Sequence, residues 1–280
     1  MIRRFFFALF FSALFLSTPA IWKKATGEFR FGKLAFDIPY NSAWEANAKV
    51  DENYFKGTFT YLAHGGQSFV FESEDGEWTL KLFRYDRWIH PWRKFIRNEW
   101  IGMKERLPYD QKIDRLFRSA KLAFEKAADL TGLVYIHLNR TEEKLPSVLL
   151  KDSLGRRHCL DLSNISFAVQ RRARPLPEVF FDAIRENDKG KFKRLTRSFA
   201  NLLKTRASRG IRNADTKVFP NFGFWGEDAI EWDFGNYWID PEMKSEEERK
   251  REVGRFLLKP QRYMSEFSEW AEEYRKEALQ

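Results

Sequence analysis

The sequence predicts an α+β fold in two parts, a strand-rich part over residues 56–172 and a helical part over residues 173–280. In the first part, short runs of aromatic and branched residues predict strands, and Asp75-Gly76 predicts a hairpin turn between two of them. One helical pattern, over residues 112–129, lies among these strands. We therefore expect an antiparallel sheet with one helix, followed by a smaller helical half.

The strand pattern occurs in short runs separated by turn residues. These runs are residues 59–62, 69–72, 78–83, 133–138, 147–150, 158–162 and 165–171. Ser153-Leu154-Gly155 predicts a second hairpin turn between the fifth and sixth runs. The helix at 112–129 carries its apolar stripe at Ile113, Leu116, Phe117, Ala120, Phe124 and Ala127.

The second part begins with two expected helices, over residues 178–185, where Pro177 suits the first turn, and over residues 192–207. Residues 210–238 have loop and short-strand character. Two further helices are expected after them. Ser245 and Glu248 predict a capping box at the start of the first. The last is expected to carry an aromatic stripe at Tyr263, Phe267, Trp270 and Tyr274.

The N-terminal segment, residues 1–22, has the pattern of a signal peptide or an uncleaved signal anchor. Arg3 and Arg4 precede an apolar run over residues 5–16, and small residues follow it up to Ala20. We therefore expect a membrane-anchored or secreted protein. Residues 23–55 are weakly patterned, which predicts an irregular lead-in to the first strand.

The composition excludes some classes of site and favours anionic partners. The only cysteine, Cys159, excludes an intramolecular disulfide, and the four histidines are too scattered for a zinc site. The net charge is +9, with basic residues concentrated over residues 171–174 and 185–212. This excess favours anionic partners such as phosphate, nucleic acid or an acidic membrane surface, and a protein partner is the further alternative. No nucleic-acid-binding motif accompanies the basic residues, and a solvated helix face remains the alternative.

Three segments carry candidate chemistry, and their order in the chain connects them. Gly65 and Gly66 lie between two expected strands, where backbone amides can approach an anion closely, although an ordinary hairpin turn has the same pattern. Lys81 follows one hairpin later, on the strand face opposite its apolar neighbours. The third segment contains oxygen donors suited to Mg²⁺, at Asp215, Asn221 and the Asp-Phe-Gly sequence that starts at Asp233.

In this order the residues resemble the protein-kinase-like superfamily, over about residues 59–238. The resemblance implies a two-lobed kinase-like fold that binds ATP with Mg²⁺. Gly65, Gly66 and Val70 would belong to the glycine loop, and Lys81 would hold the α- and β-phosphates. Glu125 is the expected ion-pair partner of Lys81, with Glu99 as the alternative.

The resemblance also implies the catalytic and metal-binding residues of the second lobe. Asp215 would orient or deprotonate a hydroxyl acceptor, while Asn221 and Asp233 would bind the metal. No His-Arg pair precedes Asp215, and only 45 residues follow Gly235, so the helical lobe is reduced. Phosphotransfer, a catalytically inactive pseudokinase scaffold and a membrane-associated basic interaction domain therefore all remain open.

Overall fold

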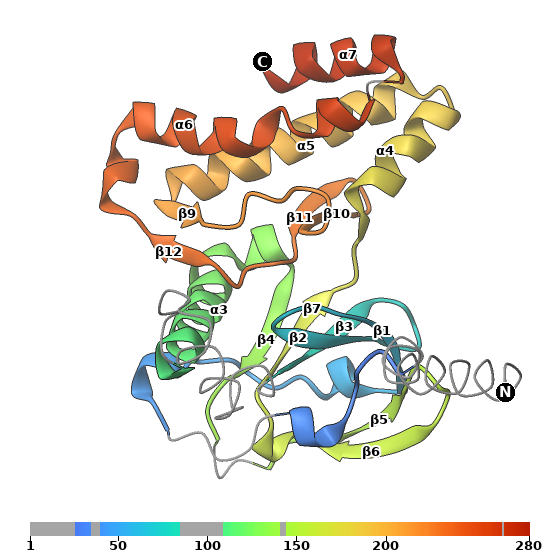
Figure 1. The fold of residues 1–280 in the computed structure, drawn as a ribbon, viewed down its shortest axis with the longest axis vertical. Helices are drawn as coiled ribbons and strands as arrows, with labels where there is room; N and C mark the ends of the chain where they lie inside the picture. Colours follow the sequence, from blue (N-terminus) through green and yellow to red (C-terminus); the bar gives the residue numbers. More distant parts are fainter. Residues whose placement is uncertain (1–25, 35–39, 85–108, 141–143, 265) are drawn as a thin grey trace, which may run out of the picture.

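The computed structural model describes residues 26–34, 40–84, 109–140, 144–264 and 266–280. They form an α+β fold, with a mixed sheet in the lower half of Figure 1 and a group of helices in the upper half. The expected signal segment, residues 1–22, lies outside the described residues. Within the described ranges, no helix is both long enough and apolar enough to cross a membrane.

The main sheet has seven strands in the order β4-β7-β3-β2-β1-β5-β6. Their bounds are β1 Thr58–His64, β2 Ser68–Glu72, β3 Trp78–Phe83, β4 Leu133–His137, β5 Ser147–Lys151, β6 Arg157–Asp161 and β7 Phe167–Arg171. The seven strand runs expected from the sequence are thus confirmed. At the Asp75-Gly76 turn, Gly76 has a φ of 72°, a left-handed conformation that glycine adopts without strain.

The expectation of a purely antiparallel sheet is wrong, because β5 runs parallel to β1. All other neighbouring strands are antiparallel. The β5–β6 hairpin docks along the outer edge of β1 and sets Leu150 opposite Phe59, and both side chains are fully buried. Burial of these apolar side chains explains why the hairpin extends the sheet.

The two faces of the sheet pack against two different clusters of buried apolar residues. Phe69, Phe71, Leu80 and Leu82 point to one face, where they pack with the lead-in residue Phe55. Residues 26–34 and 40–55 therefore help cover the outer face of the sheet. Val70 of β2 and Lys81 of β3 lie opposite each other. Because successive side chains of a strand alternate between its faces, both point to the other face of the sheet.

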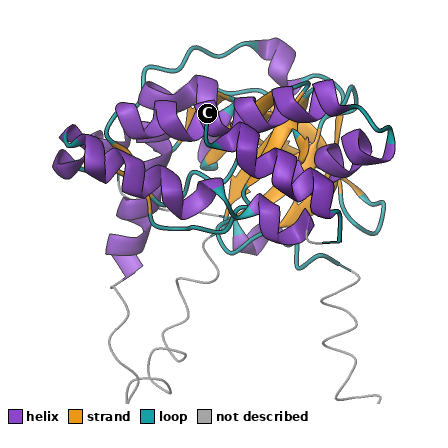
Figure 2. Cartoon of the chain, turned by 90° about the horizontal axis from the view of Figure 1, so that it is seen from above, coloured by secondary structure: helices purple, strands orange, loops and turns teal. Residues whose placement is uncertain are grey.

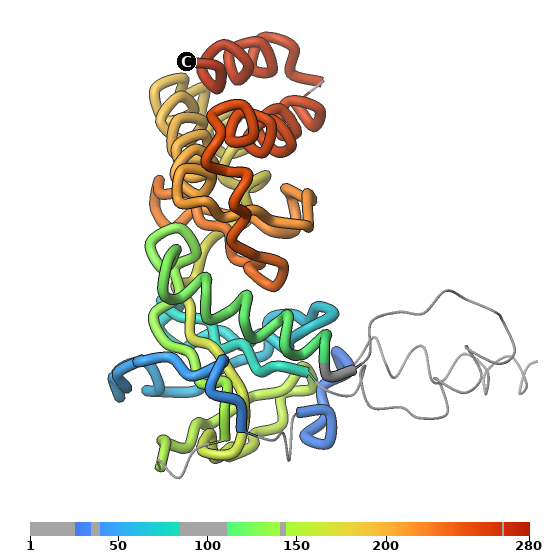
Figure 3. Tube along the Cα trace, turned by 90° about the vertical axis from the view of Figure 1, so that its left-hand side faces the viewer, coloured from blue at the N-terminus to red at the C-terminus, as the bar shows by residue number. Residues whose placement is uncertain are grey.

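Helix α3, Tyr109–Thr131, covers the second face of the sheet. Its buried side includes Ile113, Phe117, Ala120 and Ala123. Figure 3 shows α3 between the sheet and the helical half, where it contacts β4 on one side and β11 and β12 on the other. This helix therefore links the two halves of the molecule.

The helical half is built around α5. Its helices are α4 Leu176–Arg185, α5 Lys189–Ser208, α6 Glu246–Leu257 and α7 Ser268–Ala278. Its strands are β8 Arg174–Pro175, β9 Ile211–Asn213, β10 Phe222–Trp225, β11 Asp228–Glu231 and β12 Tyr237–Ile239. Viewed from above in Figure 2, the helices lie over the strands. Helix α5 packs against α4, α6 and α7, and β9 pairs with β12.

Two sequence expectations in this half are wrong. Ser245 is the N-cap of α6, but its side chain makes no capping hydrogen bond, so there is no capping box with Glu248. The last aromatic stripe is also shorter than expected. Tyr263 belongs to the 3-10 helix Pro260–Met264, ahead of α7, and is 61% exposed, whereas Trp270 and Tyr274 are buried. The helical period does not extend back across the 3-10 helix.

The basic run at residues 185–212 is largely paired within the protein. Lys189, Lys193 and Arg197 form ion pairs with Glu269, Glu273 and Glu277 of α7, in register along the two helices. These three pairs are called the α5–α7 pairs below. Arg209 adds an ion pair with Asp129 of α3 at 2.6 Å. Much of the excess positive charge therefore holds the helical half together.

Reversing one charge of the α5–α7 pairs should destabilise the protein. Arg197→Glu would place a second carboxylate beside Glu277, whose side chain is only 3% exposed. We expect the free energy of unfolding, measured with urea at low salt, to fall by about 1 kcal/mol or more. Lys204→Glu, on the same helix, is the control. The Arg197→Glu/Glu277→Arg swap should recover part of the loss. Equal effects of Arg197→Glu and Lys204→Glu would contradict this role.

Candidate functional site

Lys81 of β3 reaches from the sheet to the Asp-Phe-Gly segment that follows β11. Its Nζ atom donates a hydrogen bond to the carbonyl oxygen of Trp232 at 2.5 Å, across 151 positions of sequence. The same atom lies 5.1 Å from the centroid of the Phe234 ring. The structure thus brings together two of the three segments selected from the sequence.

The environment of Lys81 makes its ammonium group less stable than in water. The side chain is half-buried, with Val70 opposite it on β2 and the fully buried Ala168 opposite it on β7. Burial lowers the pKa of Lys81 to about 8, and the nearby Asp233 carboxylate opposes that shift. Lys81 therefore remains mainly protonated at neutral pH.

The turn with Gly65 and Gly66 lies close to the Asp-Phe-Gly segment. Both glycines are exposed, and the carbonyl oxygen of Gly65 accepts a hydrogen bond from the buried Arg84 at 3.2 Å. The next residue, Gln67, packs against Gly235, where a Cβ atom would come within 2.0 Å of the Gln67 side-chain oxygen. Gly235 therefore permits this close approach of the turn.

The structure does not form the expected ion pair between Lys81 and Glu125. Glu125 is 43% exposed and pairs with Lys121 of its own helix at 3.8 Å. Ala120, Ala123 and Ala127 point into the core, so the helical period turns Glu125 outward. Within the described ranges, no carboxylate lies at ion-pair distance from Lys81. The alternative partner, Glu99, lies outside the described residues.

Helix α3 contacts the Asp-Phe-Gly segment through a serine instead. The buried Ser119 hydroxyl donates a hydrogen bond to the Phe234 carbonyl oxygen and accepts one from the Tyr237 amide at 2.6 Å. Ser119 therefore fixes the backbone on both sides of Gly235, a role that the sequence did not indicate.

Asp215 and Asn221 lie on the segment between β9 and β10. The Asp215 carboxylate is half-buried and accepts a hydrogen bond from the Lys217 amide at 3.0 Å. Asn221 is buried, and its carbonyl oxygen accepts hydrogen bonds from the amides of Trp232, at 2.9 Å, and Asp233, at 3.4 Å. Asn221 and Asp233 are therefore neighbours, joined through their backbones.

Asn221 and Asp233 carry side-chain oxygens of the kind that a divalent cation such as Mg²⁺ prefers. The Asn221 side chain is buried, and its amide nitrogen has no hydrogen-bond partner among the described residues, but only its amide oxygen can bind a cation. Asp233 is half-buried, and one of its carboxylate oxygens accepts only the Gly235 amide, at 3.2 Å. Mg²⁺ commonly takes one or two protein oxygens and completes its shell with phosphate and water. In the described part of the chain, no cluster of three or more His, Cys, Asp or Glu residues forms a metal cage.

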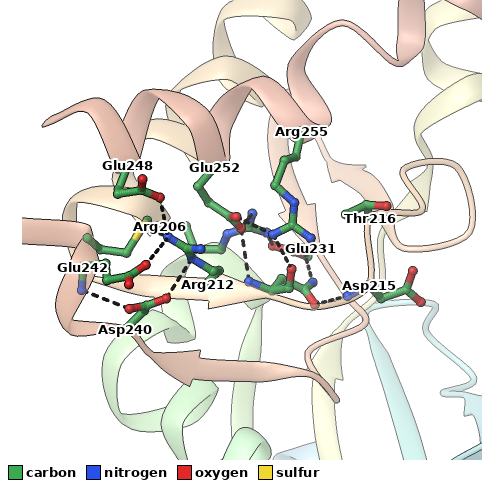
Figure 4. Close-up of polar contacts among 12 residues, drawn as sticks. Arg206, Arg212, Asp215, Thr216, Glu231, Asp240, Glu242, Glu248, Glu252 and Arg255 are labelled. Atoms are coloured by element: carbon green, nitrogen blue, oxygen red, sulfur yellow. Dashed lines mark hydrogen bonds and ion pairs between the residues drawn. The ribbon is translucent and has the colours of Figure 1, made fainter. Parts of the chain in front are cut away.

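A buried ionic cluster holds the segment that carries Asp215 (Figure 4). Arg206 of α5 is fully buried and pairs with Glu231 of β11 and Glu252 of α6. Asn213 donates from its side chain to Glu231 at 2.6 Å and from its backbone to Glu252 at 3.1 Å. The side-chain oxygen of Asn213 accepts the Asp215 amide at 2.9 Å. The cluster therefore fixes the start of the Asp215 segment, and Figure 4 shows the Asp215 carboxylate pointing away from it.

Two further side chains complete this cluster, called the Arg206 cluster below. Tyr237 donates its hydroxyl hydrogen to Glu231 at 2.5 Å, and Arg255 pairs with Glu252 at the same distance. Burial raises the pKa of Glu231 above its ordinary value, against the lowering effect of Arg206 and the hydrogen bonds. Sequence reasoning missed the cluster, although Arg206 falls on the apolar stripe of α5 with Phe199 and Leu203. A charge on such a stripe indicates a buried partner.

A scan against protein-family models and a search of curated proteins gave no match to this chain. The chemistry of the site is therefore inferred from its geometry. Lys81 supplies a cation, Asn221 and Asp233 supply oxygen donors, and Asp215 supplies a carboxylate. Such a set can neutralise a polyphosphate and accept a proton from a hydroxyl group.

The lowered pKa of Lys81 predicts how stability depends on pH. Because the folded protein binds the Lys81 proton less tightly than the unfolded chain, stability should rise as pH increases from about 8 towards 10.5. Lys81→Met should remove this part of the dependence. Urea unfolding of both proteins across this pH range, without nucleotide, measures the difference. Parallel curves for the two proteins would contradict the buried environment of Lys81.

Removing the central cation of the Arg206 cluster should strongly destabilise the protein. Arg206→Met leaves the buried Glu231 without a cation and Glu252 with only Arg255. Breaking a buried ion pair in this way typically costs about 3–5 kcal/mol. Tyr237→Phe removes one hydroxyl donor and should cost about 1.5–3 kcal/mol, which keeps the test informative if the first variant does not fold. Glu247→Gln, which breaks only the exposed pair with Arg251, is the control. Denaturant unfolding measures all three, and equal losses would contradict this account.

Proposed function

We propose that this chain is a divergent protein-kinase-like protein that binds ATP with Mg²⁺ and transfers the terminal phosphate to a hydroxyl acceptor. The proposal rests mainly on one contact of Lys81. The ammonium of Lys81 contacts the carbonyl oxygen of Trp232, directly before Asp233. A cation on the third strand beside an Asp-Phe-Gly aspartate is the arrangement that holds nucleotide phosphates in protein kinases.

The order of elements around Lys81 supports the same proposal. Lys81 lies on the third strand of the sheet, and α3 connects that strand region to β4. The segment with Asp215 and Asn221 follows the long helix α5, and the β10–β11 hairpin separates it from Asp233. In protein kinases the catalytic-loop aspartate and asparagine and the Asp-Phe-Gly aspartate occur in this order.

Each candidate residue then has a definite role. Lys81 would bind phosphate oxygens, the backbone at Gly65 and Gly66 would approach the same phosphates, and Val70 would pack against the base. Asn221 and Asp233 would hold Mg²⁺, which when bound neutralises phosphate charge. Asp215 would orient the acceptor hydroxyl and accept its proton.

A pseudokinase that binds nucleotide without phosphotransfer is the second candidate. It is favoured by the contact of Lys81 with a backbone carbonyl rather than with a carboxylate of α3. A membrane-associated basic interaction domain is less well supported, because most basic residues of the run 185–212 form ion pairs within the protein. A location with access to ATP would be compatible with the N-terminal segment acting as an anchor.

Thermal unfolding of the full chain with Mg²⁺ and ATP tests nucleotide binding. At about 100 times the dissociation constant, ATP should stabilise the folded protein by about 2.7 kcal/mol. We expect this gain to require Mg²⁺ and to be lost in Lys81→Met and Asp233→Asn. Glu125→Gln should keep it, because Glu125 pairs only with Lys121. If the parent protein shows no Mg²⁺-dependent gain, the proposal is wrong.

Release of ADP separates the two candidates. A phosphotransferase should release ADP, at least slowly to water, and Asp215→Asn should reduce that rate while Mg-ATP still stabilises the variant. A pseudokinase should show the same stabilisation in both proteins and no ADP release from either.

A further inference from the structure

Basic side chains on and just after α6 contact the segment that carries Asp215. Lys259, at the end of α6, donates from Nζ to the carbonyl oxygen of Thr216, the residue after Asp215. Arg255 donates to the carbonyl oxygen of Asn213 at 3.1 Å. Arg262, in the following 3-10 helix, donates its backbone amide to the Lys259 carbonyl oxygen at 3.2 Å. These three basic residues are called the Asp215-side cations below.

The positive charge of this group is incompletely neutralised. Arg255 pairs with Glu252 at 2.5 Å. In the described part of the chain, Lys259 and Arg262 have no carboxylate at ion-pair distance. Burial, followed by the charges of Arg255 and Arg262, lowers the pKa of Lys259, whereas Asp215 opposes the shift. A bound anion would relieve this repulsion.

The contrast with α5 shows that these unpaired charges are a local feature. On α5, Lys189, Lys193 and Arg197 each meet a glutamate of α7. Beside Asp215 an aromatic surface takes the place of acidic partners. Tyr263 is 61% exposed, and its ring centroid lies 3.7 Å from that of Phe219. The half-buried Lys259 and the exposed Arg262, next to an exposed ring, suit a compound with both a ring and an anionic group.

We infer that the site beside Asp215 takes a hydroxyl compound that also carries a phosphate or carboxylate group, such as a sugar phosphate. The Asp215-side cations would bind the anionic group, and Tyr263 would pack against the ring. The acceptor role rests on the proposed function, but binding of the anion does not.

Phosphate transfer from ATP to this acceptor needs only ATP, the acceptor hydroxyl and Asp215 as the proton acceptor. The acceptor hydroxyl oxygen attacks the terminal phosphorus of ATP and forms a new P–O bond. The bond from that phosphorus to the bridging oxygen breaks, and ADP leaves with the electron pair. The hydroxyl proton passes to Asp215 and then to solvent.

Calorimetric binding of glucose 6-phosphate and of glucose to the full chain, with Mg-ADP present, tests the inference. We expect glucose 6-phosphate to bind and glucose not to bind. Lys259→Gln/Arg262→Gln should weaken binding at least about tenfold, because hydrogen bonds to charged groups are lost. Lys250→Gln/Arg251→Gln is the matched control, since it removes the same charge from exposed positions of α6.

Vesicles distinguish a free ligand from a lipid headgroup. Phosphatidylcholine vesicles with and without phosphatidic acid present the phosphate on a membrane. A headgroup ligand should give stronger binding to the acidic vesicles, lost in Lys259→Gln/Arg262→Gln but kept in the control. A free ligand should give the glucose 6-phosphate result and no such difference between vesicles.

The outcomes separate this inference from the proposed function. If neither glucose 6-phosphate nor acidic vesicles bind, or if the control loses as much affinity as the test variant, the inference is overturned. If glucose 6-phosphate binds through the Asp215-side cations but Mg-ADP does not bind, the result supports the anion site and contradicts the proposed phosphotransfer. If Mg-ADP binds but neither anionic probe does, the nucleotide site stands and the acceptor class is wrong.

Discussion

The burial of Arg206 is the constraint on which the arrangement of the candidate site depends. A guanidinium group removed from water needs carboxylates that neutralise its charge and accept its hydrogen bonds. The Nη1 and Nη2 atoms of Arg206 both meet a carboxylate, whereas its buried Nε has no partner among the described residues. Here the partners come from β11 and α6, so α5, β11 and α6 must assemble together. Asn213 joins the same cluster. It donates hydrogen bonds to Glu231 and Glu252 and accepts one from the Asp215 amide. A folding requirement thus fixes the segment that carries the proposed catalytic carboxylate.

The sheet and α3 meet the helical half through polar contacts on either side of Asp233, which include a hydrogen bond from Gln170 of β7 to the Trp232 carbonyl oxygen at 3.4 Å. Lys81 holds the carbonyl of Trp232, and Ser119 holds the carbonyl of Phe234. Because Lys81 has no carboxylate partner on α3, we propose that its ammonium exchanges the Trp232 carbonyl oxygen for a phosphate oxygen when nucleotide binds. The candidate site therefore combines a fixed Asp215 segment with a cation that is bound to a neutral backbone oxygen.

Local patterns predicted the elements well, because strand alternation and helical spacing reflect burial along one segment. The Asp75-Gly76 turn and the strand with Lys81 are examples. Pairings across long separations were not predictable in this way, as the parallel contact between Phe59 and Leu150 shows. At the site, the order of motifs selected Lys81 and Asp233, which do lie together. The choice of Glu125 failed, although the inward positions of Ala120, Ala123 and Ala127 already turn it outward.

The most direct test of the central claim is a crystal structure of the protein with Mn²⁺ and a non-hydrolysable ATP analogue. Anomalous scattering would locate the metal independently of the protein density. The account predicts the phosphates at Lys81 and the metal at Asp233 and Asn221. Nucleotide bound at another surface, or metal bound away from both residues, would contradict it.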